Sequence, residues 1–256
     1  MPVLEARTEL SPSAGRPCGC HPKIAGDAAV SARDYLPARR TLPALRQAAA
    51  RCEGCPLHEF ATQAVFGDGP ASAPLMLVGE QPGNEEDLQG EPFVGPAGQL
   101  LDRALEQAGI SREQAYVTNV VKHFKWVARG NRRLHQKPNA REIGACLPWL
   151  QSELELIRPQ ILVCLGASAA QALLGKAFRV TERRGQWLES ELAPYVTATV
   201  HPSSILRARG DDQRHRELQL FVDDLKQVAE LLRSASKSAG NSAGNGARER
   251  RRARSP

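Results

Sequence analysis

No apolar run in this chain of 256 residues approaches the roughly 20 residues that a membrane-spanning helix needs. Residues 1–22 also lack the apolar core of a secretory signal, because they are small, polar and interrupted by proline. No segment repeats along the chain. These absences argue against a membrane partner, and we expect a cytoplasmic protein. With 41% apolar residues, the chain can bury one substantial core, which indicates a single domain.

Cysteine is also scarce. Six cysteines in a chain of this length do not suit a secreted disulfide scaffold. In a cytosolic protein, paired cysteines more often indicate metal or redox chemistry.

Net positive charge is absent from most of the chain. Residues 233–256 hold seven Lys or Arg and one Glu, which accounts for the whole net charge of +6, so residues 1–232 are formally neutral. This end is rich in Ser, Ala, Gly and Asn, and we expect a disordered basic tail. Such a tail either adds salt-sensitive affinity for phosphates or is a solvated extension without a specific role. Residues 1–40 lack sustained periodicity, which predicts a disordered leader and a folded domain over residues 41–232.

Short apolar runs alternate with helical stripes between these ends. We expect strands at residues 74–78, 115–121, 161–165 and 196–200, and helices over residues 41–50, 97–108, 143–157, 167–174 and 218–232. A long basic loop is expected over residues 122–139. Because strands alternate with helices, the sequence predicts an α/β fold, a three-layer α/β/α sandwich with a mostly parallel central sheet.

Two polar loops bent by Gly and Pro follow predicted strands. Residues 79–83 (GEQPG) come after the first strand, and residues 201–204 (HPSS) come after the last. Ligand sites of parallel sheets lie at the carboxyl edge, so these loops can face each other across one pocket. A third polar segment, residues 132–135 (RRLH), lies on the basic loop.

The cysteines offer a possible metal centre. Cys52 and Cys55 have a spacing that lets both sulfurs turn toward one centre, although two incidental thiols are the alternative. Cys146 is a further candidate, but it also lies on an apolar helical stripe, where a packed core cysteine is the ordinary explanation. We assign Cys164, in the middle of a predicted strand, to the core. The cluster at residues 18–21 (CGCH) is metal-like but has no folded context.

Taken together, residues 79–83, 132–135 and 201–204 resemble the motifs of the uracil-DNA glycosylase superfamily. They are most similar to its iron–sulfur family 4 branch and, within it, to the UdgX type. The resemblance covers roughly residues 41–232. It implies the glycosylase fold, a role in DNA repair, and uracil-containing DNA as the substrate.

Family 4 enzymes hold a [4Fe–4S] cluster with an early Cys-x-x-Cys, a cysteine after an Asn-Val-Val-Lys segment and a cysteine before Pro-Trp-Leu. The resemblance therefore implies Cys52, Cys55 and Cys146 as ligands. In this chain His123 follows the Asn-Val-Val-Lys segment in place of cysteine, and imidazole can replace thiolate at a cluster iron. We expect His123 to be the fourth ligand of a structural cluster, with an exposed loop histidine near DNA as the alternative.

The resemblance also implies a uracil pocket for a flipped base. Phe93 matches the stacking aromatic, and Asn119 matches the residue that reads the base, since an amide suits N3–H and O4. His201 matches the histidine that contacts O2 and favours departure of the base as an anion. We also assign Gln81, which stands where many family 4 members have a smaller residue, to uracil. A core phenylalanine, a cap asparagine and a capped loop histidine are the structural alternatives.

Other residues are assigned to DNA and to the reaction. The resemblance implies that Ser203, Ser204, Arg207, Arg132 and Arg133 contact phosphates, although an exposed charge cluster is the alternative for the last two.

Residues 129–135 resemble the basic loop that distinguishes the UdgX type, with Asn131 in place of Lys and Leu134 in place of Ile. In that type the final histidine attacks C1′ and stays bonded to the abasic DNA, which implies His135 as nucleophile and Glu80 as its orienting carboxylate.

We therefore predict a monomeric, single-turnover glycosylase that prefers single-stranded DNA. The alternatives are a hydrolytic family 4 enzyme, a noncatalytic uracil-DNA-binding protein and a zinc-bearing nucleotide-binding module.

Overall fold

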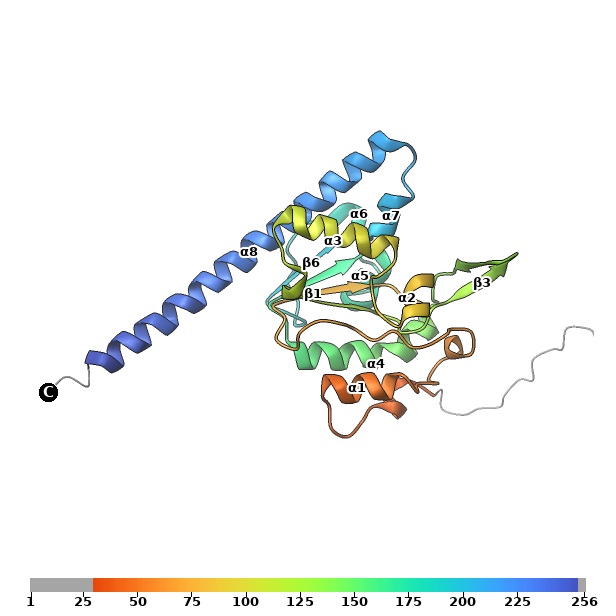
Figure 1. Cartoon of the computed structure of the whole chain (residues 1–256), viewed down its shortest axis with the longest axis horizontal. Coiled ribbons are helices and arrows are strands. Elements are labelled where there is room, and N and C mark those ends of the chain that lie inside the picture. The colour runs from red at the N-terminus through yellow and green to blue at the C-terminus, as the bar shows by residue number, and fades with distance from the viewer. Residues whose placement is uncertain (1–29, 253–256) are drawn as a thin grey trace, which may run out of the picture.

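The computed structural model describes the backbone of residues 30–252 and the side chains of residues 30–235 (Figure 1). Most of the predicted leader, including the cluster at residues 18–21, lies outside the described residues. Among the helices of the described part, none combines the length and the apolar character that crossing a bilayer requires.

Four parallel strands form the central sheet. They are β1 (Leu75–Gly79), β2 (Ala115–Asn119), β5 (Ile161–Leu165) and β6 (Tyr195–Thr199), in the order β2-β1-β5-β6. Every residue of the first three strands is buried, because helices cover both faces of the sheet. Gly79 pairs with Asn119 and Leu165 with Thr199, so the carboxyl ends of all four strands lie level at one edge.

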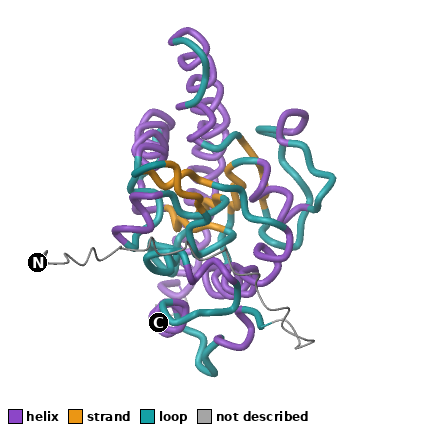
Figure 2. The backbone as a smooth tube through the Cα atoms, turned by 90° about the vertical axis from the view of Figure 1, so that its right-hand side faces the viewer, coloured by secondary structure: helices purple, strands orange, loops and turns teal. Residues whose placement is uncertain are grey.

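Helices form the outer two layers. On one face lie α3 (Pro96–Ala108), α7 (Pro202–Leu206) and α8 (Asp211–Arg252), and on the other lie α1 (Leu42–Ala49), α4 (Ala140–Ile157) and α5 (Ala167–Leu174). Figure 2 shows the strands between these helices. Alternate residues of β1 enter the two cores, Met76 on the α4 side and Leu77 on the α3 side. The predicted three-layer α/β/α architecture is confirmed.

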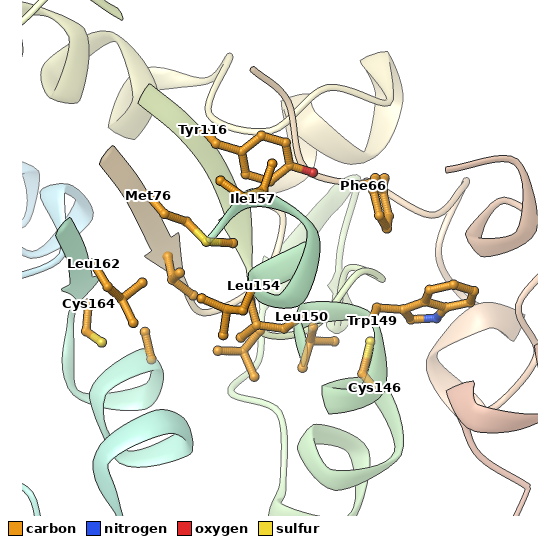
Figure 3. Packing of buried hydrophobic residues seen from close by; sticks show 14 of the residues in the cluster. Phe66, Met76, Tyr116, Cys146, Trp149, Leu150, Leu154, Ile157, Leu162 and Cys164 are labelled. Atoms are coloured by element: carbon orange, nitrogen blue, oxygen red, sulfur yellow. The ribbon is translucent and has the colours of Figure 1, made fainter. Parts of the chain in front are cut away.

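Local sequence signals set the ends of the helices. The Asn139 side chain caps α4 by accepting hydrogen bonds from backbone N–H groups of the first turn. In return, the Glu142 carboxylate accepts a hydrogen bond from the Asn139 N–H at 2.7 Å. Gly109, in the left-handed conformation at φ 77°, ends α3 where the sequence places its end. Figure 3 shows the apolar side of α4, where Trp149 and Leu150 are fully buried.

Part of the predicted leader belongs to the fold. A short 3-10 helix, η1 (Ala32–Tyr35), packs on α4, and Ala32 is fully buried. A Cβ on Gly54 would lie 2.6 Å from the carbonyl carbon of Ser31, so the two backbones are in close contact. The prediction of disorder was wrong here, because a single turn is too short to show periodicity.

The predicted basic loop contains a hairpin. β3 (Trp126–Arg129) and β4 (Arg132–His135) pair antiparallel around a turn in which Gly130 has φ 58°. The hairpin projects from the body of the molecule (Figure 1). The sequence did not predict these strands because they are short and carry exposed charged residues, which hides any alternation of apolar positions.

Five short elements complete the described chain: α2 (Asn84–Gln89), α6 (Val180–Arg183), η2 (Pro56–Glu59) and η3 (Arg112–Gln114), with η1 above. The last helix differs from its prediction, because the backbone of α8 stays helical to Arg252, into the segment predicted to be a disordered tail. The Gly, Asn and Ser residues of this segment have low helix propensity, but a helix that continues from a packed segment needs no new nucleus.

Candidate active site

The predicted polar loops meet at the carboxyl edge of the sheet. Glu80 follows β1, Asn119 ends β2 and His201 comes shortly after β6. Nε2 of His135 lies 3.3 Å from Oε1 of Glu80, and the rings of Phe93 and His201 stack, so side chains of separate loops meet at this edge. The edge therefore carries the site that the sequence predicts for a parallel sheet.

The Asn119 amide and the Phe93 ring both lie close to the end of β1. A Cβ on Gly79 would lie 2.4 Å from Oδ1 of Asn119 and 2.8 Å from Cζ of Phe93, so both side chains can come this close to the strand only because the residue is glycine. Oδ1 of Asn119 is buried and has no hydrogen-bond partner among the described residues. Leaving a buried acceptor unpaired costs about 1–3 kcal/mol. An unpaired acceptor is therefore expected where the atom binds a donor on a ligand.

A buried ion pair holds the backbone of Asn119. Nζ of Lys122 donates to the carbonyl oxygen of Asn119 at 2.8 Å and lies 2.6 Å from Oε2 of Glu153. Both members of this ion pair are buried, and Glu153 also accepts from the hydroxyl groups of Thr118 and Tyr116. Because each polar group of the network has a hydrogen-bond partner, the network fixes the backbone of Asn119 and with it the position of the amide.

Phe93 lies in a tight loop. Its backbone has φ 60°, a left-handed conformation that a bulky residue rarely adopts. A Cβ on Gly98 would lie 1.6 Å from the Phe93 carbonyl oxygen, so the tight loop depends on that glycine. The Phe93 ring stacks on the ring of His201, with centroids 6.1 Å apart and an interplanar angle of 27°. Phe93 is thus buried, in the core on the α3 side and against the ring of His201.

His201 is poised as a neutral hydrogen-bond donor. Burial lowers its pKa to about 4, although the carboxylate of Glu80 opposes the shift. The backbone N–H of Ser203 donates to Nδ1 at 3.2 Å. Since Nδ1 is an acceptor in the neutral ring, the proton resides on Nε2.

His135, the last residue of β4, contacts Glu80. Its Nε2 lies 3.3 Å from Oε1 of Glu80, and its ring centroid is 6.2 Å from that of Phe124. The His135 side chain is 52% exposed, so one side of the imidazole remains accessible from outside. The hairpin therefore brings the predicted nucleophile and its predicted orienting carboxylate together.

Ser168 is a residue of this site that the sequence reasoning missed. Its hydroxyl donates to Oε2 of Glu80, the oxygen that does not face His135. Burial alone would raise the pKa of Glu80, but the hydrogen bonds from His135 and Ser168 outweigh it, so the pKa lies below its ordinary value. Ser168 follows β5 in the same way that Glu80 follows β1, and that placement at a strand end was the available signal.

Residues 66–226 match the family model of the Uracil DNA glycosylase superfamily. The chain belongs to this superfamily. It is 36% identical to the type-4 uracil-DNA glycosylase of Thermotoga maritima over 184 residues, which cover 72% of this chain and 90% of that protein. It is also 36% identical to the type-4 enzymes of Pyrobaculum aerophilum, with 70% and 92% of the two chains covered, and of Archaeoglobus fulgidus, with 70% and 87% covered.

Two residues assigned from the superfamily resemblance have other partners. The Gln81 amide donates through Nε2 to the carbonyl oxygens of Lys125 at 3.2 Å and Gln136 at 3.0 Å, and its Oε1 accepts from the Lys125 N–H at 3.0 Å. Both of its N–H groups are used, so we correct the assignment of Gln81 to uracil.

The Arg133 side chain also has partners inside the protein. Its Nη1 lies 2.6 Å from Oδ2 of the fully buried Asp87, and its Nε donates to Oδ1 of Asn84 at 2.8 Å. The guanidinium also packs over the rings of Phe124 and Trp126. Arg133 therefore ties the hairpin to α2, which corrects its assignment to phosphate.

The other residues assigned to phosphates lie on accessible surface. Arg132 and Arg207 are exposed. The hydroxyl of Ser204 donates to the carbonyl oxygen of His201 at 2.7 Å, and the Ser203 hydroxyl lies 2.8 Å from Nδ1 of the same residue. The assignment of these four residues to phosphates stays a prediction.

The residues that superfamily resemblance assigns to a cluster are all buried. Cys52, Cys55 and Cys146 are free thiols, and Nδ1 of His123 is buried without a hydrogen-bond partner among the described residues. Burial raises the pKa of Cys146 to about 12, and the nearby Cys55 and Cys52 contribute to the shift. Cys164 lies well apart from Cys146 in Figure 3 and is a core residue, as the sequence predicts.

The donor set fits an iron–sulfur cluster. The indole Nε1 of Trp149 donates to Sγ of Cys52 at 3.4 Å, and the backbone N–H of Lys122 donates to Sγ of Cys146 at 3.2 Å, which are the hydrogen bonds to sulfur that tune such clusters. No group of three or more potential ligands in the described part of the chain converges on a single ion. Thiolate and imidazole are the ligand types that iron–sulfur clusters take, so the fit rests on residue type and on these hydrogen bonds to sulfur.

Proposed function

We propose that this protein excises uracil from DNA and then traps the abasic product through a covalent bond from His135 to C1′. The observation that carries the proposal is the contact between His135 and Glu80, at the sheet edge that also carries Asn119. We place the base between the Asn119 amide and the Phe93 ring, and we call this place the uracil gap. The similarity to type-4 uracil-DNA glycosylases supports the choice of substrate.

Recognition of uracil uses groups that face the gap. The unpaired Oδ1 of Asn119 accepts from N3–H, and the amide nitrogen donates to O4. The flipped base stacks on Phe93, and Nε2–H of His201 donates to O2. Cytosine presents an acceptor at N3 and an amino group at position 4, so the same amide would face it with mismatched groups.

Cleavage breaks the bond between C1′ and N1 of the base. The electron pair leaves with uracil, whose anion is stabilised by the donor on His201, and the sugar becomes an oxocarbenium-like cation. Glu80 is ionised at neutral pH because its pKa is lowered, so its carboxylate stabilises the positive charge that develops beside it.

Trapping forms a bond between an imidazole nitrogen of His135 and C1′. When the Nε2–H group of His135 donates a hydrogen bond to Glu80, Nδ1 keeps the lone pair that attacks the cation. The alkylated ring is an imidazolium, and its proton stays on the ring or passes to the Glu80 carboxylate. The uracil anion takes a proton from water. One enzyme molecule is consumed for each uracil, unless water reaches C1′ first.

We further propose that Cys52, Cys55, His123 and Cys146 hold a [4Fe–4S] cluster. When bound, the cluster would supply a crosslink between the segment after α1, the loop after β2 and α4, and excision requires no electron transfer from it. A brown protein that absorbs near about 400 nm and contains iron is expected, as for cysteine-ligated clusters. A colourless protein that contains zinc would contradict this assignment.

The test of the main proposal is a denaturing gel after incubation with a uracil-containing oligonucleotide, single-stranded in one arm and double-stranded in the other. We expect a slowly migrating protein–DNA band, stronger with the single strand. Free DNA that breaks in alkali, without that band, would indicate a hydrolytic glycosylase of the type-4 kind, which the relatives favour. Intact, alkali-resistant DNA would indicate binding without catalysis.

A further inference from the structure

We infer that Gln81 positions His135 for trapping by fixing the base of the β3–β4 hairpin to the loop that carries Glu80. The inference rests on the proposed function. It gives a specific task to a residue that lies outside the uracil gap and touches no reacting atom.

The Gln81 side chain bonds both arms of the hairpin. It is 7% exposed, and its amide makes three hydrogen bonds to backbone groups: two with Lys125, which precedes β3, and one with Gln136, which follows β4. The N–H of Gln136 also donates to the carbonyl oxygen of Lys125 at 2.9 Å. The amide therefore closes the open end of the hairpin, where the two arms leave the body of the protein.

The hairpin needs such an anchor. Its strands have four residues each and pair only with one another, not with the main sheet. An isolated two-stranded hairpin is marginally stable in water. The Arg133–Asp87 ion pair holds one face of β4, but His135 is the terminal residue of that strand. His135 pairs with Trp126 inside the hairpin, and the bond from Gln81 to the carbonyl of Gln136, the next residue, ties this end of the hairpin to the loop after β1.

The position of Gln81 in the sequence couples the two halves of the trap. Glu80 contacts the His135 ring, and the following residue holds the backbone beside that histidine. Attack at C1′ competes with attack by water, and such a competition depends on how closely the nucleophile is held to the reacting carbon. Loosening the hairpin should therefore affect capture by His135 more than cleavage of the base, which relies on Asn119 and His201.

The experiment compares Gln81→Ala and the isosteric Gln81→Glu with a matched control, Gln136→Ala. The control removes an exposed side-chain amide beside the site but keeps the backbone carbonyl that Gln81 uses. Gln81→Glu keeps the size of the side chain but points a carboxylate at two carbonyl oxygens. The ratio of covalent adduct to free abasic DNA is measured with enzyme in excess, and amide hydrogen exchange is measured at Lys125 and Gln136.

We expect both Gln81 variants to lower the adduct-to-abasic ratio by about tenfold or more, the size of effect that loss of positioning produces. Hydrogen exchange at Lys125 and Gln136 should accelerate in these variants, and Gln136→Ala should match the unmodified protein in both measurements. If Gln81→Ala does not fold, Gln81→Glu decides. An unchanged ratio in a folded Gln81 variant would overturn the inference. If the unmodified protein gives no adduct, the proposed function fails instead.

Discussion

The Nε2 atom of His135 lies 3.3 Å from Oε1 of Glu80, although one residue ends a surface hairpin and the other follows the first strand of the sheet. Ser168 holds the second oxygen of the same carboxylate. One oxygen of the Glu80 carboxylate therefore contacts Ser168 and the other contacts His135. A carboxylate held in this way orients the ring and stabilises the charge that the ring acquires, as a covalent trap requires.

Replacing His135 with Ser should abolish the covalent band, because no other imidazole lies at the same position. Free abasic DNA should appear in its place if water enters the vacated space. The readout is a denaturing gel, followed by alkali. His215→Ser, a change of the same kind on the exposed side of α8, is the control and should trap normally. A band that persists in His135→Ser would mean that another residue is the nucleophile.

Replacing Ser168 with Ala should shift the acidic limb of the pH–rate profile to higher pH. The hydroxyl of Ser168 helps to lower the pKa of Glu80, so its removal raises that pKa, and the carboxylate is protonated sooner as the pH falls. Ser168→Thr keeps the hydroxyl and should restore the original profile. The rate of uracil release is measured from about pH 3 to about pH 9, a range that extends below the ordinary carboxyl pKa of about 4.3. Equal profiles for Ser168→Ala and Ser168→Thr would contradict the role of this hydroxyl.

Replacing Gly79 with Ala should block the uracil gap. The new Cβ would lie 2.4 Å from Oδ1 of Asn119, within the space that the base requires. We expect kcat/KM for uracil release to fall by about 100-fold, the effect of a displacement near 1 Å at a reacting centre. Gly144→Ala on α4, where a Cβ would meet nothing within 4 Å, is the control and should keep full activity. Full activity in Gly79→Ala would place the base elsewhere.

The two neighbouring arginines of the hairpin should behave differently. Arg133→Gln leaves the fully buried Asp87 without its ion pair, which typically costs about 3–5 kcal/mol. Arg132→Gln, on exposed surface, should leave the free energy of unfolding unchanged, and it should weaken DNA binding and reduce the slope of log K against log salt by about 0.7–0.9. Urea unfolding and salt-dependent binding measure the two effects. The reverse pattern would restore Arg133 as the phosphate contact.

Replacing His123 with Cys should keep the iron content of the protein and lower the reduction potential of the cluster, because thiolate ligation gives lower potentials than imidazole. His123→Ala should reduce the iron content and the visible absorbance. His58 lies close enough to influence His123, so His58→Ala is the control and should leave the iron content unchanged. Unchanged iron and potential in all three variants would exclude His123 as a ligand.

Several structural roles could be predicted because they depend on local sequence. The apolar runs of β1 and β5 predict buried strands, since only a strand covered on both faces can use such residues throughout. Gly109 ends α3 as predicted, because few other residues adopt its left-handed conformation without strain. Glu80 and Asn119 come at the ends of predicted parallel strands, so the sequence alone predicts that both lie at one edge of the sheet.

Other roles depend on contacts between distant segments. Gln81 and Arg133 were both assigned to DNA or base from their motifs, but each is used inside the protein, by backbone groups of the hairpin and by Asp87. Ser168 comes shortly after a predicted strand, which places it near the edge, but its partner is known only from its contact with Glu80. Ala32 was assigned to the leader, yet it is buried against α4.

The layered α/β fold, the edge of the sheet where the polar loops gather and the superfamily could all be predicted from local sequence, because strand burial, helix termination and motifs are properties of short segments. The tertiary structure alone decided which polar side chains remain available to a ligand. Hydrogen bonds between residues far apart in the chain use the side-chain amide of Gln81 and the Nε and Nη1 atoms of Arg133. They leave Oδ1 of Asn119 without a partner from the described part of the protein and one side of the His135 ring exposed.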